Sequence, residues 1–462
     1  MSPTTSHPSR PDPLPLGGIL AYGGLFAVLL PVALTMWARR LDTLLTLPAL
    51  GPWWLGAVLA AVGAALAAGA VASLWFDGGG LPMSPYPPAR LVARGVYRVV
   101  ADPIYVGAAL LCGGLSIVAA SPSGVWIVTP VVALSATAFV LGYERDATRA
   151  RFGTLPVPWL RLRAPWVLIA SWVWCCRGAE AVANSWREWR VGPARMMSHG
   201  LYAAAGSTAG VALAAWLAGP GALWWIVLAT IGAEVGSAMW AQLVEGSPQL
   251  LRPYGYFGAV IAAALLCGVM GAFGLDGWRL ASAMAVGGCV TQVLGRFRCL
   301  VQGCCHGRPI DRPWGIRYRH ERSRVVRLSQ LGGVRLHPTP AYSIVWTTFT
   351  LCVLIVLWLL AVPLPFIGGG YLILIGLGRF VEEHYRGEPQ TAWAAGLRLY
   401  QWLAIGFVVI GAGVTAVGAP PAPAPVPPGL GAIPALALVA VVTYAAFGVD
   451  FPAASRRFSR LV

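Results

Sequence analysis

The segment RLASAMAVGGCVTQVLGRFRCLVQGCCHGR, residues 279–308, begins as a mostly apolar run and ends among arginines, glycines and cysteines. Its first part, 279–295, has the composition of a membrane-spanning helix, which needs roughly 17–25 mostly apolar residues. The polar end holds Arg296, Arg298 and Arg308 among glycines, which let a ligand approach the backbone, and arginine binds phosphate in a bidentate manner. The segment therefore predicts a helical membrane protein with an anion site at a helix end.

The composition supports a membrane protein over a soluble one. Of 462 residues, 57% are hydrophobic and 11% are charged, and the mean hydropathy is +0.69. Soluble domains carry about 25% charged residues, so that class is excluded. All 33 basic residues are arginines, against 17 acidic residues, giving a net charge of +16. They form short clusters between apolar runs, so we expect no nucleic-acid binding.

The apolar runs predict an all-α, polytopic transmembrane helical bundle of about 12–13 spans in two modules. The expected spans are 17–37, 52–75, 104–121, 124–142, 198–218, 221–244, 256–275, 279–295, 343–362, 366–380, 399–418 and 430–449, with a weaker one at 165–182. We read the first as a retained helix, because it runs directly into arginines. The expected parts are a first module (1–183), a linker (184–197), a second module (198–418), and a Pro-rich hinge with an extra span (419–462).

Three of the nine cysteines lie together in the sequence, outside the apolar runs. Cys299, Cys304 and Cys305 precede His306, but their spacing lacks the C-x2-C pairs of common zinc sites. We therefore expect no metal site.

Two polar segments, 77–103 and 143–163, bring charge to helix ends in the first module. Short-linked helices would place these ends on one membrane face, where they could hold a cytosolic ligand with an amine, a carboxylate and an adenine. The alternative is that these arginines only anchor the loops on the cytosolic side.

The stretch PYPPARLVARGVYRVVADPIYVG, residues 85–107, resembles the signature of the isoprenylcysteine carboxyl methyltransferase and phospholipid methyltransferase superfamily. The matching positions are Pro87, Pro88, Leu91, Val92, Gly95, Tyr97, Arg98, Pro103, Tyr105 and Gly107, and downstream Tyr143, Glu144, Phe152 and Gly153. The resemblance implies S-adenosylmethionine as cofactor, bound through Arg98, Asp102, Tyr105 and Glu144. Asp102 stands where the family has Asn or His, and Arg145 where it has a second Glu.

A second charged cluster lies in GRFVEEHYRGEP, residues 378–389, at the end of another apolar run. At helical spacing, Arg379, Glu383 and Arg386 fall on one face. Ionisable groups at membrane depth are candidates for a functional site. The alternative is an Arg–Glu pair that only orients two helices.

The order of motifs from 198 to 418 is similar to prolipoprotein diacylglyceryl transferase. The resembling pieces are Ser198–Leu201, Gly232–Gly236, Tyr256–Gly258, Gly295-Arg296, Gly303, Gly307-Arg308, Trp314-Gly315, His337–Thr339, Tyr342, Arg379-Phe380, Glu383, Arg386 and Gln401. That family moves a diacylglyceryl group from phosphatidylglycerol to a lipoprotein cysteine at the outer membrane face.

The resemblance implies roles for individual residues of the second module. Arg296 and Arg379 would clamp the phosphate, and His199, Tyr256 and Glu383 would complete the catalytic set. Gly303, Gly307, Arg308, His337, Tyr342 and Arg386 would bind substrate. Because a tyrosine and a histidine of the family appear exchanged here, we expect His199 to be the base. Glu234, at the position of a family arginine, could pair with another arginine.

The leading prediction is a diacylglyceryl transferase of the bacterial inner (plasma) membrane, with a phosphatidylglycerol-like phospholipid and a lipoprotein precursor or other thiol acceptor as partners. We expect no cofactor for the second module. One alternative is a methyltransferase whose C-terminal half binds lipid, and another is a non-catalytic lipid-binding protein. If both modules are active, residues 165–182 must cross the membrane, placing the N-terminus inside and 184–197 outside.

Overall fold

The computed structural model describes residues 16–48, 50–81, 88–158, 165–245, 254–387, 392–456 and 458–461. They form two compact units: unit 1 contains residues up to 136 and 148–162, and unit 2 contains 137–147 and 163–462. Residues 82–87, which include Pro87, and residues 159–163 of the predicted polar segments lie outside the described residues.

Unit 1 is built from apolar helices that pack closely through glycine. On the paired helices α3 and α5, a Cβ at Gly63 or Gly56 would collide with the backbone of the other helix at Gly107 or Gly114. Small residues at such contacts let membrane helices approach each other. The elements are α1 (Leu16–Gly24), η1 (Leu25–Leu29), α2 (Leu30–Asp42), α3 (Trp53–Ser73), η2 (Leu74–Gly78), α4 (Val96–Val99), α5 (Pro103–Val118), η3 (Gly124–Val128), and parts of α6 (Thr129–Phe139) and α7 (Arg145–Phe152).

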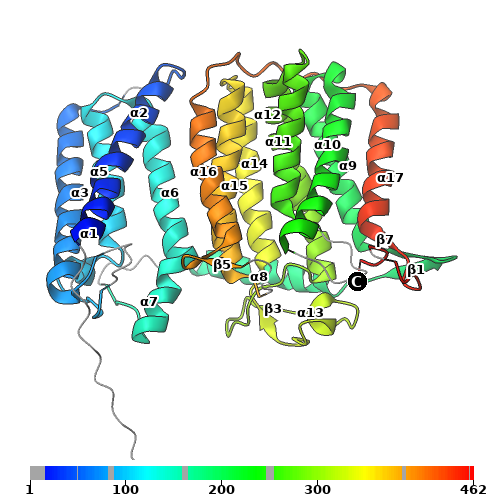
Figure 1. Ribbon diagram of the computed structural model, residues 1–462, viewed down its shortest axis with the longest axis horizontal. Coiled ribbons are helices and arrows are strands. Elements are labelled where there is room, and N and C mark those ends of the chain that lie inside the picture. Colours follow the sequence, from blue (N-terminus) through cyan, green and yellow to red (C-terminus); the bar gives the residue numbers. More distant parts are fainter. Residues whose placement is uncertain are drawn as a thin grey trace, which may run out of the picture. The chain divides into compact units, whose positions relative to one another are not determined.

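Unit 2 is a bundle of long helices with a polar layer at one end. Figure 1 shows α9–α12 and α14–α17 running side by side, with α8, α13 and the short strands at their lower ends. The helices are η4 (Val140–Glu144), α8 (Trp166–Ala183), α9 (His199–Ala218), η5 (Pro220–Ala222), α10 (Leu223–Trp240), η6 (Ala241–Glu245), α11 (Tyr256–Ala272), α12 (Gly277–Gln302), α13 (Arg324–Arg327), α14 (Thr339–Leu359), α15 (Leu364–Tyr385), α16 (Leu399–Thr415), η7 (Leu430–Ala432) and α17 (Ile433–Gly448).

Three small antiparallel sheets order the polar layer. They pair β1 (Glu188–Val191) with β2 (Ala194–Met197) and β2 with β7 (Val449–Asp450), β3 (Ile316–Arg317) with β4 (Arg335–Leu336), and β5 (Trp393–Ala394) with β6 (Leu397–Arg398). The β3–β4 pair closes the segment between α12 and α14, residues 303–338, which we call the head segment.

The predicted all-α polytopic bundle is confirmed. Among the described residues, eight helices are long and apolar enough to cross a membrane, and three shorter apolar helices are Pro103–Val118, Tyr256–Ala272 and Leu399–Thr415. These eleven coincide with eleven of the expected spans. The expected run 17–37 forms α1, η1 and α2 and is not among the eleven.

The weak span expected at 165–182 does not cross the bundle. It forms α8, which lies across the ends of the long helices in Figure 1. Glu180 interrupts the apolar run and pairs with Arg319 of the head segment at 3.0 Å, while Asn184 donates to the carbonyl of Arg317 at 2.8 Å. Asp146, upstream of α8, reaches Arg308 of the same head segment. Asp146 and Asn184 therefore lie at the same end of the bundle, and the predicted crossing between the segment 143–163 and residues 184–197 is wrong.

The division into units differs from the expected module boundary at 184–197. Helix α8 belongs to unit 2, as does α17, whose Thr443 donates to Glu234 of α10 at 2.5 Å. The Pro-rich segment before α17 is also packed, since the carbonyl of Pro423 accepts from the Trp358 indole at 3.0 Å.

Helices α9 and α12 meet at Gly210 and Gly287, where a Cβ on either would collide with the backbone of the other. We expect Gly210→Leu to lower the free energy of unfolding by about 1–3 kcal/mol, because the helices must separate. Thermal unfolding in detergent measures the change. Gly413→Leu, in open space on α16, is the control. Equal shifts for the two variants would contradict close packing at Gly210.

Candidate active site

Three helices bring a buried cluster of arginines and a glutamate together at the lower end of unit 2. Arg296 of α12 and Arg379 of α15 both pair with Glu382 of α15, at 3.2 and 2.8 Å. Ser343 of α14 donates to the same carboxylate at 2.5 Å. Arg296, Arg379 and Glu382 are at most 9% exposed. A buried charge needs partners, and this shared carboxylate holds two guanidinium groups in place.

A second arginine–glutamate pair lies one turn further along α15. Arg386 Nη1 lies 3.6 Å from Glu383 Oε2, and Arg386 Nη2 donates to Cys305 Sγ at 3.4 Å. Both side chains are nearly fully buried. Neither oxygen of Glu383 has a hydrogen-bond partner among the described residues. Glu383 is thus a buried carboxylate with one ion-pair partner and unused acceptor capacity on both oxygens.

The backbone around the predicted glycines positions these arginines. Gly303 ends α12 in the left-handed region, with a φ of 73°. Gly307 forms a bridge with Arg386, and a Cβ there would collide with the backbone of His337. Both glycines therefore have structural roles beside the cluster.

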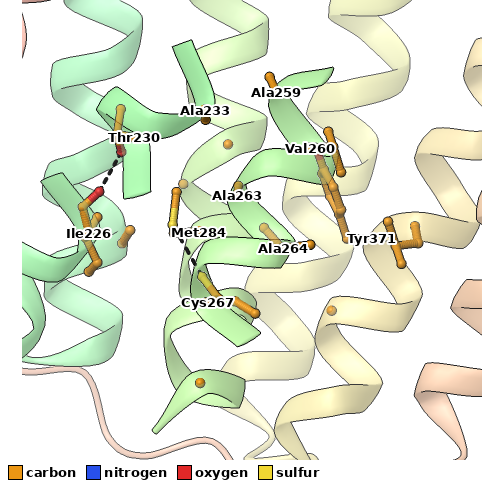
Figure 2. A pocket seen from close by; sticks show the side chains of 18 of the residues that line it. Ile226, Thr230, Ala233, Ala259, Val260, Ala263, Ala264, Cys267, Met284 and Tyr371 are labelled. Atoms are coloured by element: carbon orange, nitrogen blue, oxygen red, sulfur yellow. Dashed lines mark hydrogen bonds between the residues drawn. The ribbon is translucent and has the colours of Figure 1, made fainter. Parts of the chain in front are cut away.

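An apolar cavity of about 800 Å³ lies between α9, α10, α11, α12, α15 and α16. Figure 2 shows small side chains such as Ala259 and Ala263 along its wall, with Tyr371 at one side. The hydroxyls of Tyr256 and Tyr371 are 2.9 Å apart, and Gln292 donates to Tyr371 at 2.9 Å. The Arg379 guanidinium lies 5.3 Å from the Tyr256 ring centroid. Tyr256 therefore contacts both the cavity and the arginine cluster.

Arg308, predicted to bind substrate, is half-exposed and pairs with Asp146 at 3.1 Å. His384 Nε2 lies 2.9 Å from the same carboxylate oxygen. Asp146 lies in the sequence segment that resembles a methyltransferase. Most of that segment belongs to unit 1, but Asp146 belongs to unit 2.

His337 and Tyr342, also predicted to bind substrate, contact each other in the head segment and α14. His337 Nδ1 lies 3.0 Å from the Tyr342 hydroxyl. Burial and the nearby Arg308 charge lower the pKa of His337 from 6.5 to about 4. His337 is therefore neutral at pH 7, as an orienting hydrogen-bond partner should be.

This shift predicts a pH dependence of stability. Between pH 6.5 and about 4 the unfolded chain binds a proton at His337 that the folded chain does not, so stability falls as pH falls through this window. We expect His337→Gln to have a shallower dependence of thermal unfolding on pH between 7 and 5 than the parent protein. Identical slopes would show that His337 is not held neutral by the fold.

His199, expected to be the base, has no hydrogen-bond partner on either ring nitrogen among the described residues, and its role stays a prediction. It is fully buried, with its ring 4.8 Å from that of Trp186, and the charged groups acting on it are Arg298, Arg324 and Arg195. Its position at the start of α9 does not support an exchange of roles with Tyr256. Glu234 likewise pairs with Thr443 and with no arginine among the described contacts.

The residues expected to hold S-adenosylmethionine are divided between the units. Arg98, Asp102 and Tyr105 belong to unit 1, and Glu144 belongs to unit 2. Each of these four residues already interacts with another group of the chain.

The sequence did not predict that two arginines share one carboxylate. It placed Glu383 on one face with Arg379, whereas Glu382 joins Arg379 to Arg296. The i, i+3 spacing of Arg379 and Glu382 was a usable signal. Ser343, Tyr371 and Gln292 gave no such signal, because only tertiary packing brings them to the site.

Comparison with known proteins finds two families that resemble different parts of the chain. Residues 188–417 match the family model of prolipoprotein diacylglyceryl transferase, and residues 52–154 match that of phospholipid methyltransferase. A phosphatidylglycerol–prolipoprotein diacylglyceryl transferase of Clostridium tetani is 24% identical over 198 residues, covering 40% of this chain and 76% of that protein. One from Polaromonas is 32% identical over 128 residues, covering 26% of this chain and 42% of that protein. The two-part resemblance is confirmed: residues 188–417 are similar to prolipoprotein diacylglyceryl transferase and residues 52–154 to phospholipid methyltransferase.

Proposed function

We propose that this chain is a multi-pass membrane transferase that moves a diacylglyceryl group from an anionic phospholipid to a cysteine thiol. One observation carries the proposal: an apolar cavity of about 800 Å³ meets a buried arginine cluster at Tyr256. Acyl chains suit the cavity, and the phosphate suits the arginines. The name of these relatives, phosphatidylglycerol–prolipoprotein diacylglyceryl transferase, describes the same pair of substrates.

The chemistry requires stabilisation of a leaving phosphate. The acceptor sulfur attacks the glyceryl carbon, a carbon–sulfur bond forms, and the carbon–oxygen bond to phosphate breaks. Negative charge grows on the departing phosphate, where preorganised donors lower the barrier most. Arg379 Nε is buried without a hydrogen-bond partner among the described residues, so it can donate to this phosphate.

The thiol must lose its proton, because the thiolate is the nucleophile. Glu383 can accept it, since both its buried oxygens lack hydrogen-bond partners in the described part of the chain. The proton then leaves on the phosphate product, which balances the reaction.

Proteoliposomes with phosphatidylglycerol labelled in its diacylglyceryl part test the proposal. A lipobox peptide with cysteine is expected to acquire the label, and the same peptide with serine is not. Arg296→Ala should abolish labelling, because Glu382 then loses a partner and the phosphate loses a donor. Arg319→Ala, a head-segment arginine whose side chain is 62% exposed, is the matched control. Absence of labelling with the parent protein would favour a lipid-binding protein without this activity.

The similarity of residues 52–154 to phospholipid methyltransferase supports a second activity. We propose S-adenosylmethionine as its cofactor, held by residues of unit 1 that include Arg98 and Tyr105. Binding of labelled S-adenosylmethionine to the purified protein, reduced in Arg98→Gln, is the expected result. No binding to the parent protein would remove this activity. We further propose the bacterial inner membrane as the location.

A further inference from the structure

The three clustered cysteines lie directly beside the arginine site. The Sγ atoms of Cys299, Cys304 and Cys305 all lie within 4.8 Å of one another, and those of Cys304 and Cys305 are 3.8 Å apart. All three thiols are free and half-buried. Zinc binds sulfur at about 2.3 Å, so tetrahedral zinc ligands lie about 3.8 Å apart. A small contraction of the cluster would place three sulfurs around one ion.

The turn at the end of α12 forms the cluster despite the unfavourable sequence spacing. Cys299 lies in the last turn of the helix, Gly303 ends it in a left-handed conformation, and the chain then returns Cys304 and Cys305 toward Cys299. Thr339 fixes this turn by donating to the carbonyl of Cys305 at 2.5 Å.

A buried phenol gives an independent indication of a ligand. Tyr318 is fully buried, and its hydroxyl has no hydrogen-bond partner among the described residues. It interacts electrostatically with all three thiols. Burying an unpaired hydroxyl is costly. None of the three sulfurs accepts from this hydroxyl, so it is available to a group bound beside the cluster.

The charge around the cluster also suits a metal–thiolate group. Three thiolates and one divalent ion carry a net charge of −1, and Arg386 already donates to Cys305 at 3.4 Å. Arg296 interacts electrostatically with Cys299 and Cys305. With Arg379, these arginines exceed the carboxylates Glu382 and Glu383 by one positive charge, which offsets the −1 of the metal–thiolate group.

Within the described residues, the cluster offers three ligands and no fourth. Both ring nitrogens of the neighbouring His306 are engaged, Nδ1 with the carbonyl of Gly307 and Nε2 with Ser329, each at 3.0 Å. Three protein ligands with one open position are characteristic of catalytic zinc sites, whereas structural sites are closed by four.

We propose that Cys299, Cys304 and Cys305 bind a zinc ion whose open position takes the acceptor cysteine as a thiolate. This role rests on the proposed function. Coordination to zinc deprotonates a thiol outright, so the ion supplies the activated nucleophile. The proton passes to Glu383, which Arg386 joins to Cys305. The acceptor sulfur then attacks the glyceryl carbon with its electron pair, and the proton leaves with the phosphate product.

Cobalt(II) titration of the full-length, chelator-treated and reduced protein tests the metal site. We expect a saturable sulfur-to-cobalt charge-transfer band at one equivalent, displaced by zinc. Cys304→Ser should weaken binding more than about 100-fold, beyond the effect of losing an outer-shell contact. Cys352→Ser, an exposed cysteine on α14, should bind normally. Cys299→Ser repeats the test if the first variant unfolds. No saturable band, or equal bands in all variants, would overturn the site.

A second measurement tests the open position without requiring transfer. Adding the cysteine lipobox peptide to the cobalt protein should strengthen the band, and the serine peptide should leave it unchanged. No change with cysteine would overturn the acceptor role. Equal labelling by zinc-free and zinc-loaded protein would also overturn that role while leaving the proposed transferase intact. A peptide-dependent band without any labelling would instead contradict the transferase.

Discussion

Replacement of Arg379 by glutamine is expected to slow labelling of the cysteine peptide about 100- to 1000-fold, the usual cost of removing one charge-stabilising donor. Arg379 is 5% exposed, pairs with Glu382 at 2.8 Å and lies against the Tyr256 ring. Its guanidinium is therefore fixed where the apolar cavity meets the polar cluster. Initial rates in proteoliposomes, at saturating and limiting phospholipid, measure the loss.

Two further variants separate charge from position. Arg379→Lys keeps the positive charge but loses the planar bidentate geometry, so we expect an intermediate rate. Arg319→Gln, in the exposed head-segment pair with Glu180, should retain the parent rate. A parent-like rate for Arg379→Gln would show that phosphate is stabilised elsewhere.

Asp450→Ala is expected to lower the free energy of unfolding by about 3–5 kcal/mol, because buried Arg195 loses both hydrogen bonds to its carboxylate and keeps only the 3.8 Å pair with Glu188. Asp450 is fully buried and accepts two hydrogen bonds from Arg195, at 2.9 and 2.7 Å. It also accepts from the backbone of Leu461 at 3.0 Å. One carboxylate thus joins β2 to β7 and to the C-terminal residues. Denaturant or thermal unfolding in detergent measures the change.

The double variant Arg195→Met with Asp450→Leu is the control for this pair. Replacing both charges with apolar side chains removes the buried arginine charge, so it should recover much of the lost stability. If the double variant is as unstable as Asp450→Ala, packing or the contact with Leu461 is responsible, not the arginine's loss of Asp450.

The sequence predicted most helices of the fold, because a run of about 20 apolar residues leaves a membrane chain few alternatives. It failed at α8, where the run is interrupted by Glu180. The apolar length suggested a crossing, but Glu180 is paired with Arg319 of the head segment. A hydropathy average covers only neighbouring residues. It therefore does not detect Arg319, which lies well over 100 residues from Glu180 in the sequence.

The candidate site was predicted in part. Arg296, Arg379 and Arg386 come together as the motifs indicated, because each lies at the lower end of a long helix. Glu382 rather than Glu383 joins two of them, since the rotation of α15 decides which carboxylate faces α12. The ring of His199 makes an edge contact with Trp186, and no hydrogen bond in the described part of the chain joins it to these arginines. Motif order does not specify helix rotation, so these assignments needed the packed bundle.

The sequence by itself determined a membrane bundle with arginines at helix ends, because hydropathy and charge are local properties of the chain. The tertiary structure decided which groups share the site: the Glu382 pairs, the Tyr256–Tyr371 contact and the three-cysteine cluster. The spacing of Cys299, Cys304 and Cys305 argued against a metal. The left-handed Gly303 turn nevertheless brings their sulfurs within 4.8 Å of one another, because side-chain proximity depends on the path of the backbone between them.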